Sequence, residues 1–157
     1  MSRQKFQGFT LVEILIVVVI MAVLAAVVIP QFTGSTDDAK RSTAEFNIGV
    51  VRSVVQTFRA HHAGVKPAFP TGATTIDALL KETNAAGTVA VGGGFGPYLV
   101  AMPDNPFTGV ATVKAVATPG TSPVAGDVTA NDAGGWIYDA SVGNLWLDSN
   151  TQGEFAW

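Results

Sequence analysis

The sequence contains no cysteine, two histidines and few charged residues, which make up 13% of its 157 positions. Without cysteine the chain has neither a disulfide framework nor a thiol nucleophile, and thiolate metal sites are excluded. The 9 basic and 12 acidic residues give a net charge of −3, so the composition does not predict a surface that binds nucleic acid. The hydrolase motifs G-x-S-x-G and H-E-x-x-H are absent as well, and we do not expect an enzyme.

One long apolar run near the N-terminus dominates the sequence instead. Residues 14–29 are all apolar, and from Phe9 onward the run covers about 21 positions. A helix of that length spans roughly 30 Å, the thickness of a bilayer core. Arg3 and Lys5 precede the run, which predicts a cytoplasmic N-terminus and an extracytoplasmic remainder. A cleaved secretory signal is the alternative, but no A-x-A-like site follows a short apolar stretch.

A single acid, Glu13, lies within this apolar run. A carboxylate in a membrane-spanning segment costs free energy, and such residues are usually kept for a partner. Because the penalty is smaller near a helix end, an alternative is that Glu13 only reaches toward the lipid head groups. The local sequence around Glu13 favours a partner.

The stretch GFTLVE, residues 8–13, follows a short basic leader and resembles the processing site of type IV pilins and type II secretion pseudopilins. The resemblance implies that a membrane peptidase removes the leader, residues 1–8, by cutting between Gly8 and Phe9, and then methylates the new amino group of Phe9. It also implies that Glu13 and Pro30 act in filament assembly. A second segment, GPYLVAMPDNPFTG at 96–109, is similar to part of many major pseudopilins and indicates that type.

The physical chemistry of such a cut agrees with an assembly role for Glu13. The new amine of Phe9 would lie four residues before Glu13, about one helical turn away. A neighbouring copy shifted by about one turn could bring its own amine to the same carboxylate. Because an unpaired carboxylate is costly in a low dielectric and a paired one much less so, Glu13 would penalise isolated subunits and favour one axial register.

Pro30 closes the apolar run, and it predicts either a bend in a continuing helix or a simple helix end. From Asp37 to His62, apolar residues recur at helical spacing, which predicts one buried stripe. The stripe consists of Phe46, Val50, Val51, Val54, Val55 and Phe58. We therefore expect a single helix from about Phe9 to His62, bent near Pro30 and ended by Gly64. Residues 9–30 would be the transmembrane and filament-core helix, and 31–157 the extracytoplasmic head, with the helix continuing over 31–63.

The remaining head sequence predicts a small sheet. Strands are expected at residues 111–117, 136–139 and 144–148, paired as a three-stranded antiparallel sheet on the helix. A short helix is expected at 76–83, capped by Thr74 or Thr75. The glycine-rich tract 87–100 lacks G-K-[ST] and predicts a loop without phosphate-binding chemistry, and 118–133 predicts a variable loop. The fold class is therefore α+β and type IV pilin-like, with a long N-terminal helix packed against a small antiparallel sheet.

Metal binding has two groups of candidates. His61 and His62 are adjacent, so on a helix their side chains point about 100° apart and cannot chelate one ion as an i, i+4 pair could. Several major pseudopilins have a calcium site near the C-terminus, and that resemblance makes four acids calcium candidates, the alternative being solvated turn acids. These acids are Asp127, Asp132, Asp139 and Asp148. No other cofactor is expected.

Together these features predict a structural filament subunit, similar to the major pseudopilin of a type II secretion system. The resemblance implies a single-pass inner-membrane protein whose filament lies in the periplasm or at the cell surface. It implies as partners further copies of the chain, the prepilin peptidase and methylase, a platform protein, an assembly ATPase and minor pilins. Two alternatives remain open: a type IV pilin for adhesion, motility or DNA uptake, and a membrane-tethered binding module. Many such pilins have a C-terminal disulfide loop, so the absence of cysteine disfavours the pilin.

Overall fold

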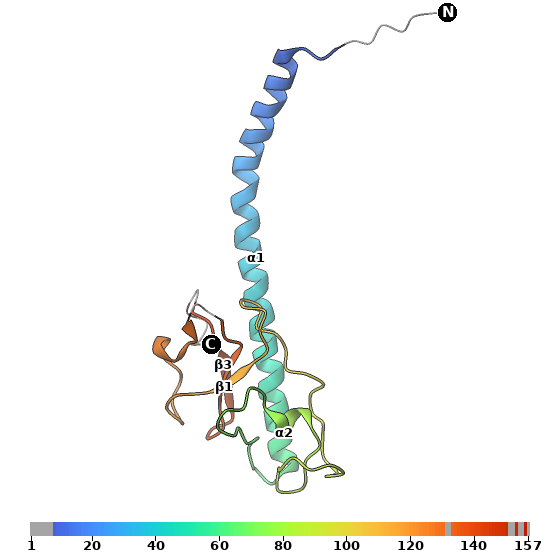
Figure 1. The fold of residues 1–157 in the computed structure, drawn as a ribbon, viewed down its shortest axis with the longest axis vertical. Coiled ribbons are helices and arrows are strands. Elements are labelled where there is room, and N and C mark those ends of the chain that lie inside the picture. Colours follow the sequence, from blue (N-terminus) through green and yellow to red (C-terminus); the bar gives the residue numbers. More distant parts are fainter. Residues whose placement is uncertain (1–7, 131–132, 151–152, 154–155, 157) are drawn as a thin grey trace, which may run out of the picture. The chain divides into compact units, whose positions relative to one another are not determined.

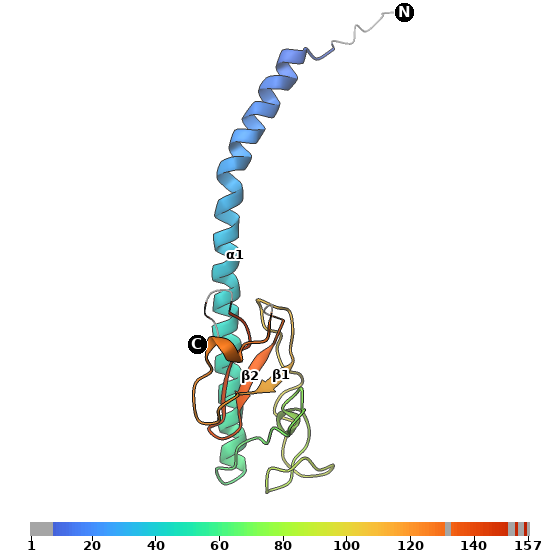
Figure 2. The same cartoon turned by 60° about the vertical axis from the view of Figure 1, so that its left-hand side comes forward.

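A computed structural model describes residues 8–130, 133–150, 153 and 156, without the side chains of residues 30–33. The elements in chain order are α1 (Leu11–His61), α2 (Asp77–Leu80), β1 (Val113–Ala115), the 3-10 helix η1 (Ala125–Asp127), β2 (Trp136–Asp139) and β3 (Asn144–Leu147), labelled in Figures 1 and 2 where space allows. The chain divides into two compact units with their boundary between residues 39 and 40. The predicted α+β, pilin-like fold class is confirmed, with one long helix followed by a small sheet.

The first unit contains the N-terminal part of α1, which is long and apolar enough to cross a membrane. Its large apolar side chains from Leu11 to Ile29 are all exposed, by between 43% and 81%. The helix continues through residue 30, so the interpretation of Pro30 as a helix end is wrong. A proline removes only one backbone hydrogen bond, and the helical residues on both sides of it form the others. The bend near Pro30 stays a prediction.

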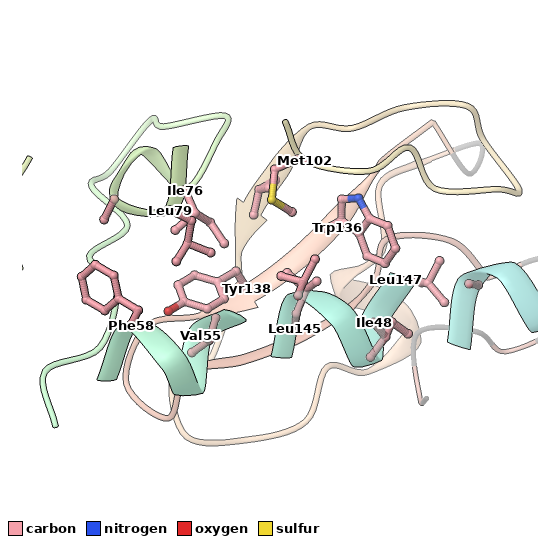
Figure 3. Close-up of a cluster of buried hydrophobic side chains, with 14 residues drawn as sticks. Ile48, Val55, Phe58, Ile76, Leu79, Met102, Trp136, Tyr138, Leu145 and Leu147 are labelled. Atoms are coloured by element: carbon pink, nitrogen blue, oxygen red, sulfur yellow. The ribbon is translucent and has the colours of Figure 1, made fainter. Parts of the chain in front are cut away.

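The second unit, the head, is built on the rest of α1. Its buried stripe contacts the inner face of the sheet, where Trp136, Tyr138 and two leucines are buried (Figure 3). The indole of Trp136 donates to the Pro103 carbonyl at 2.8 Å, and the Tyr138 hydroxyl donates to the Pro67 carbonyl at 3.0 Å. The polar groups of these two buried aromatic side chains therefore both have hydrogen-bond partners. The stripe consists of Ala44, Ile48, Val51, Val55 and Phe58.

The prediction that Phe46 and Val50 belong to this buried stripe is wrong, because both lie on the exposed side of the helix. Phe46 is 70% exposed and Val50 is 36% exposed, whereas Ile48 and Val55 are buried. At about 100° per residue, position 46 lies about 200° around the helix from position 48. The sequence thus contains two apolar stripes on opposite sides of α1, and only one of them covers the sheet.

The sheet has the order β1-β2-β3 and is mixed. β2 and β3 are antiparallel, with Trp136 opposite Leu147, as the hairpin pattern predicts. β1 and β2 are parallel, with Val113 opposite Trp136, so the prediction of a wholly antiparallel sheet is wrong. The reason is the long connection over 116–135, which carries the chain back to the starting end of β1 before β2 begins.

Helix α2 is shorter than predicted and has a different cap. It spans Asp77–Leu80, and Ile76 occupies the N-cap position without a side-chain hydrogen bond. Thr75 donates instead to the Asp77 carboxylate at 2.7 Å. The helix cannot continue because Lys81 is extended. The Leu79 carbonyl also accepts from the backbone N–H groups of residues 98 and 99, at 2.8 and 2.9 Å.

Candidate assembly site

The N-terminal end of α1 is organised by Thr10 and Glu13. Glu13 Oε2 accepts hydrogen bonds from the Thr10 backbone N–H and from the Thr10 hydroxyl, both at 2.8 Å. In return the Glu13 N–H donates to Thr10 Oγ1 at 3.2 Å. This reciprocal pair is a capping box, which satisfies backbone N–H groups that have no partner within the helix. Sequence reasoning missed the role of Thr10, although the T-x-x-E spacing was its signal.

The cap places three of the four predicted site residues at one end of the helix. Gly8 and Phe9 directly precede Thr10, and Phe9 is 84% exposed. The Glu13 carboxylate is turned back toward this end by its hydrogen bonds to Thr10. Pro30 lies in the same helix, about 25 Å farther along the axis at 1.5 Å per residue.

Two of the calcium candidates lie around a lysine side chain. The ammonium of Lys114 is 2.9 Å from Asp148 Oδ1, and it donates to the Asp127 carbonyl and, at 3.0 Å, to the Thr129 hydroxyl. Thr129 also donates to both oxygens of Asp148, at 2.7 and 2.5 Å. The carboxylate of Asp127 is used elsewhere, accepting the Val124 N–H at 2.8 Å beside η1. The Lys114 ammonium thus lies between the Asp148 carboxylate and the backbone carbonyl of Asp127.

Asp139 lies apart from this cluster, at the end of β2. Its buried carboxylate accepts the Gly120 N–H at 2.5 Å and the Ser141 N–H at 2.7 Å. Burial acts to raise the pKa of Asp139, but hydrogen bonds from the Ser141 side chain and from these backbone groups outweigh burial, so the pKa is lowered. Asp132 lies outside the described residues. Among the residues that are described, no three His, Asp or Glu side chains are grouped to hold a metal ion.

The two histidines fasten the end of α1 to the following loop. His62 is buried, and its Nε2 is 3.0 Å from the Thr83 hydroxyl and 3.3 Å from the Tyr98 hydroxyl. His61 Nδ1 is 3.1 Å from the same Tyr98 hydroxyl. Burial raises the pKa of Tyr98, which therefore keeps its proton at neutral pH. Both histidines have structural partners in the head.

Comparison with known proteins agrees with the geometry at the start of α1. The family described as "Prokaryotic N-terminal methylation motif" matches residues 3–29, which include Thr10 and Glu13. The chain is 29% identical over 144 residues to the type II secretion system core protein G of Pseudomonas aeruginosa, covering 92% of this chain and 98% of that protein. The chain is thus similar to a type II secretion system core protein G over nearly its whole length. No solved structure matches the chain significantly.

Two further relatives show how far the similarity of this chain extends. It is 33% identical over 82 residues to the type II secretion system core protein G of Klebsiella michiganensis, covering 52% of this chain and 55% of that protein. It is 29% identical over 91 residues to the major component of the type IV narrow pilus of Thermus thermophilus, covering 55% and 78%. The chain therefore spans nearly all of the Pseudomonas relative but about half of the Klebsiella one. Its apolar N-terminal helix fits a membrane anchor.

Proposed function

We propose that the protein is a structural subunit of the pseudopilus of a type II secretion system, and that it polymerises through its N-terminal helix to drive export. The observation that carries this proposal is the uncovered apolar part of α1, which begins at the Thr10 and Glu13 cap. Such a helix needs cover, which the bilayer supplies before assembly and other copies supply within the filament. The subunit acts by assembling, and no catalytic residue is required.

Processing would convert the N-terminal end into a binding group. A prepilin peptidase would cut between Gly8 and Phe9, and its methylase activity would modify the amine of Phe9. The cut would leave a cation directly before the cap that orients Glu13. Both Thr10 hydrogen bonds end on Oε2, and in the filament the carboxylate would also accept the amine of a neighbouring copy.

The membrane placement follows from the same helix. Residues 9–30 would anchor the subunit in the inner membrane, with the N-terminus in the cytoplasm and the head, residues 31–157, outside. A platform protein and an assembly ATPase would then extract the helix into a filament that also contains minor pilins. Pro30, which removes one backbone hydrogen bond, would let the helix loosen during that step.

A surface type IV pilin is the second candidate, favoured by the similarity to the Thermus pilus component. Deleting the gene in its native host separates the two functions. The secretion function predicts that exported enzymes accumulate inside the cell, whereas the pilin function predicts that surface fibres disappear. If the protein is instead a membrane-tethered binding module, whose N-terminal motif serves only insertion, the deletion should affect neither surface fibres nor export.

Mass spectrometry of the protein purified from its native host tests the processing step. The proposal predicts a chain that begins at Phe9 and has gained one methyl group on its amine. An intact Met1, or a start beyond Ala26, would contradict the proposed processing.

A further inference from the structure

We propose that the outer edge of residues 88–91, in the loop that follows α2, is a site where an extended, uncharged segment of a different protein adds as a further strand (Figure 1). This edge segment belongs to a small ladder that is separate from the sheet. In the ladder Thr83 pairs antiparallel with Val89 on one side and with Phe95 on the other. Among the described residues no other segment pairs with Val89, so residues 88–91 form one edge of the ladder.

The hydrogen bonds of the ladder turn the backbone of Val89 outward. The Thr83–Val89 pair is flanked by two bonds, from the Ala90 N–H to the Glu82 carbonyl at 2.9 Å and from the Asn84 N–H to the Thr88 carbonyl at 3.0 Å. In such an antiparallel pair the N–H and C=O groups of the two residues point away from each other. Within the described part of the chain, the N–H and C=O of Val89 have no hydrogen-bond partner. A donor and an acceptor therefore point away from the ladder, as strand addition requires.

The edge segment lacks the features that usually keep a further strand from adding. Natural edges are often blocked by lysine, by proline or by a covering element. Here residues 83–96 contain neither a charged residue nor a proline. Val89 is 42% exposed and Val91 is fully exposed. Threonine and valine also favour extended backbone, so the segment suits pairing with another strand.

The surroundings of Val89 have room for the side chains of an added strand. Val89 lines two hollows, of about 410 and about 380 Å³, and no other residue lines both. The apolar lining of the first hollow includes Leu80, Val91 and Pro97, and that of the second includes Val65 and Pro70. Because successive side chains of a strand point in opposite directions, we expect alternate side chains of the added segment to enter the two hollows.

The charges around the two hollows favour an uncharged occupant. Two cations and two acids line the hollows, and each already has a partner within the head. Lys81 is 2.7 Å from the Asp77 carboxylate, and Lys66 donates to the Ser141 carbonyl. Glu82 Oε2 accepts the Gly92 N–H at 2.6 Å. A charged segment would compete with these pairs, whereas an uncharged one leaves them intact.

The occupant is a different protein because of the symmetry of the alternative. Two copies of the chain that joined through the same edge segment would be related by a twofold axis, and such a contact closes into a dimer. In a filament all copies point the same way and repeat a head-to-tail contact, which a twofold contact cannot supply. This choice of occupant rests on the proposed filament function. The strand-adding edge itself does not.

A defined peptide tests strand addition. The probe is a short capped peptide of alternating threonine and valine, added to the full-length protein in detergent. We expect a Kd of about 1 mM or tighter, and exchange of the Val89 amide hydrogen slowed about tenfold or more in the complex. The same peptide with every backbone nitrogen methylated has no donors and should not bind. Equal binding of the two peptides, or no binding of the first at about 1 mM, would overturn strand addition.

Two exposed valines provide matched variants. Val91→Lys places a charge beside the edge, as natural edges do, and should weaken peptide binding about tenfold or more. Val100→Lys changes another fully exposed valine, outside the edge segment, and should change binding less than about twofold. Both variants should keep the Tm of the wild type. Peptide binding by Val91→Lys as tight as that of the wild type would overturn the site.

Filament assembly then separates the occupant from the proposed function. Val91→Lys should form filaments as abundantly as the wild type in the native host. Loss of filaments in this variant at an unchanged Tm would show that the edge contacts another copy, which would overturn a different protein as the occupant. A wild-type chain that forms no filaments would contradict the filament function, and peptide binding would still decide whether the edge adds a strand.

Discussion

The ammonium of Lys114 lies 2.9 Å from the Asp148 carboxylate, whose side chain is only 3% exposed. The same ammonium donates to the Asp127 carbonyl and the Thr129 hydroxyl, so it ties the loop after η1 to β1 and to the residue that follows β3. A lysine thus supplies positive charge where the sequence predicted calcium ligands. The loop after η1 is therefore held in place by the side chain of Lys114.

Replacing this lysine should destabilise the head. Lys114→Met leaves the nearly buried carboxylate of Asp148 without its cation, and we expect a loss of about 2 kcal/mol in the free energy of unfolding. Urea unfolding of the purified chain in detergent measures it. Lys81→Met is the control, because its pair with Asp77 is exposed and should contribute less than about 0.5 kcal/mol. EDTA should leave the wild-type midpoint unchanged, and a calcium-dependent rise would contradict the role of Lys114.

Thr10 should be needed for the orientation of Glu13. Thr10→Ala removes the hydroxyl, and with it two of the three hydrogen bonds between Thr10 and Glu13, and should destabilise the first turn by about 1 kcal/mol, while Thr10→Ser keeps the hydroxyl. We expect slower filament formation by Thr10→Ala and near-normal formation by Thr10→Ser, with equal membrane insertion of both. Electron microscopy of sheared filaments measures the yield. Equal filament yields from the two variants would show that the Thr10 hydroxyl is not needed for filament assembly.

Acid stability should depend on Asp139. Its hydrogen bonds with Gly120 and Ser141 lower its pKa in the folded head below the ordinary value of 3.8. The folded state therefore binds fewer protons than the unfolded state, so the stabilisation is present above about pH 4 and is lost as pH falls through the folded pKa. Asp139→Asn should be less stable at pH 7 and should lose less stability on acidification, as measured by Tm against pH. A parallel shift at every pH would show that the charge of Asp139 contributes nothing.

The two sides of α1 should respond differently to the same substitution. Phe58 is completely buried, and Phe58→Ala should cost about 3 kcal/mol or more in the free energy of unfolding. Phe46 is 70% exposed, and Phe46→Ala should change that free energy by less than about 0.5 kcal/mol. Thermal unfolding followed by circular dichroism compares them. A similar loss of Tm in both variants would show that Phe46 packs within the head.

The sequence predicted the parts of the fold that local patterns determine. The hairpin of β2 and β3 agrees with alternating side chains around the turn at Gly143, which has a φ of 80°. Gly64, with a φ of 88°, ends α1 as predicted, its N–H donating to the Arg59 carbonyl at 2.7 Å. Each of these features is set within a few residues of chain.

What the sequence could not predict depends on distant residues. The parallel pairing of β1 and β2 depends on the path of a long connection, which no local pattern determines. Helical periodicity cannot tell which of two apolar stripes faces the sheet, and so Phe46 was assigned to the core. Lys114 meets Asp148 from a different strand, so nothing in the spacing of the acids indicated that a lysine would lie among them.

The filament yield of Glu13→Gln in the native host, measured beside the wild type at equal membrane insertion, most directly tests assembly through the N-terminal helix. Glutamine keeps a hydrogen-bond acceptor for the Thr10 cap but removes the charge that would bind the amine of a neighbouring Phe9. We expect the variant to enter the membrane normally and to form few or no filaments. A variant that forms filaments as abundantly as the wild type would contradict assembly through this carboxylate.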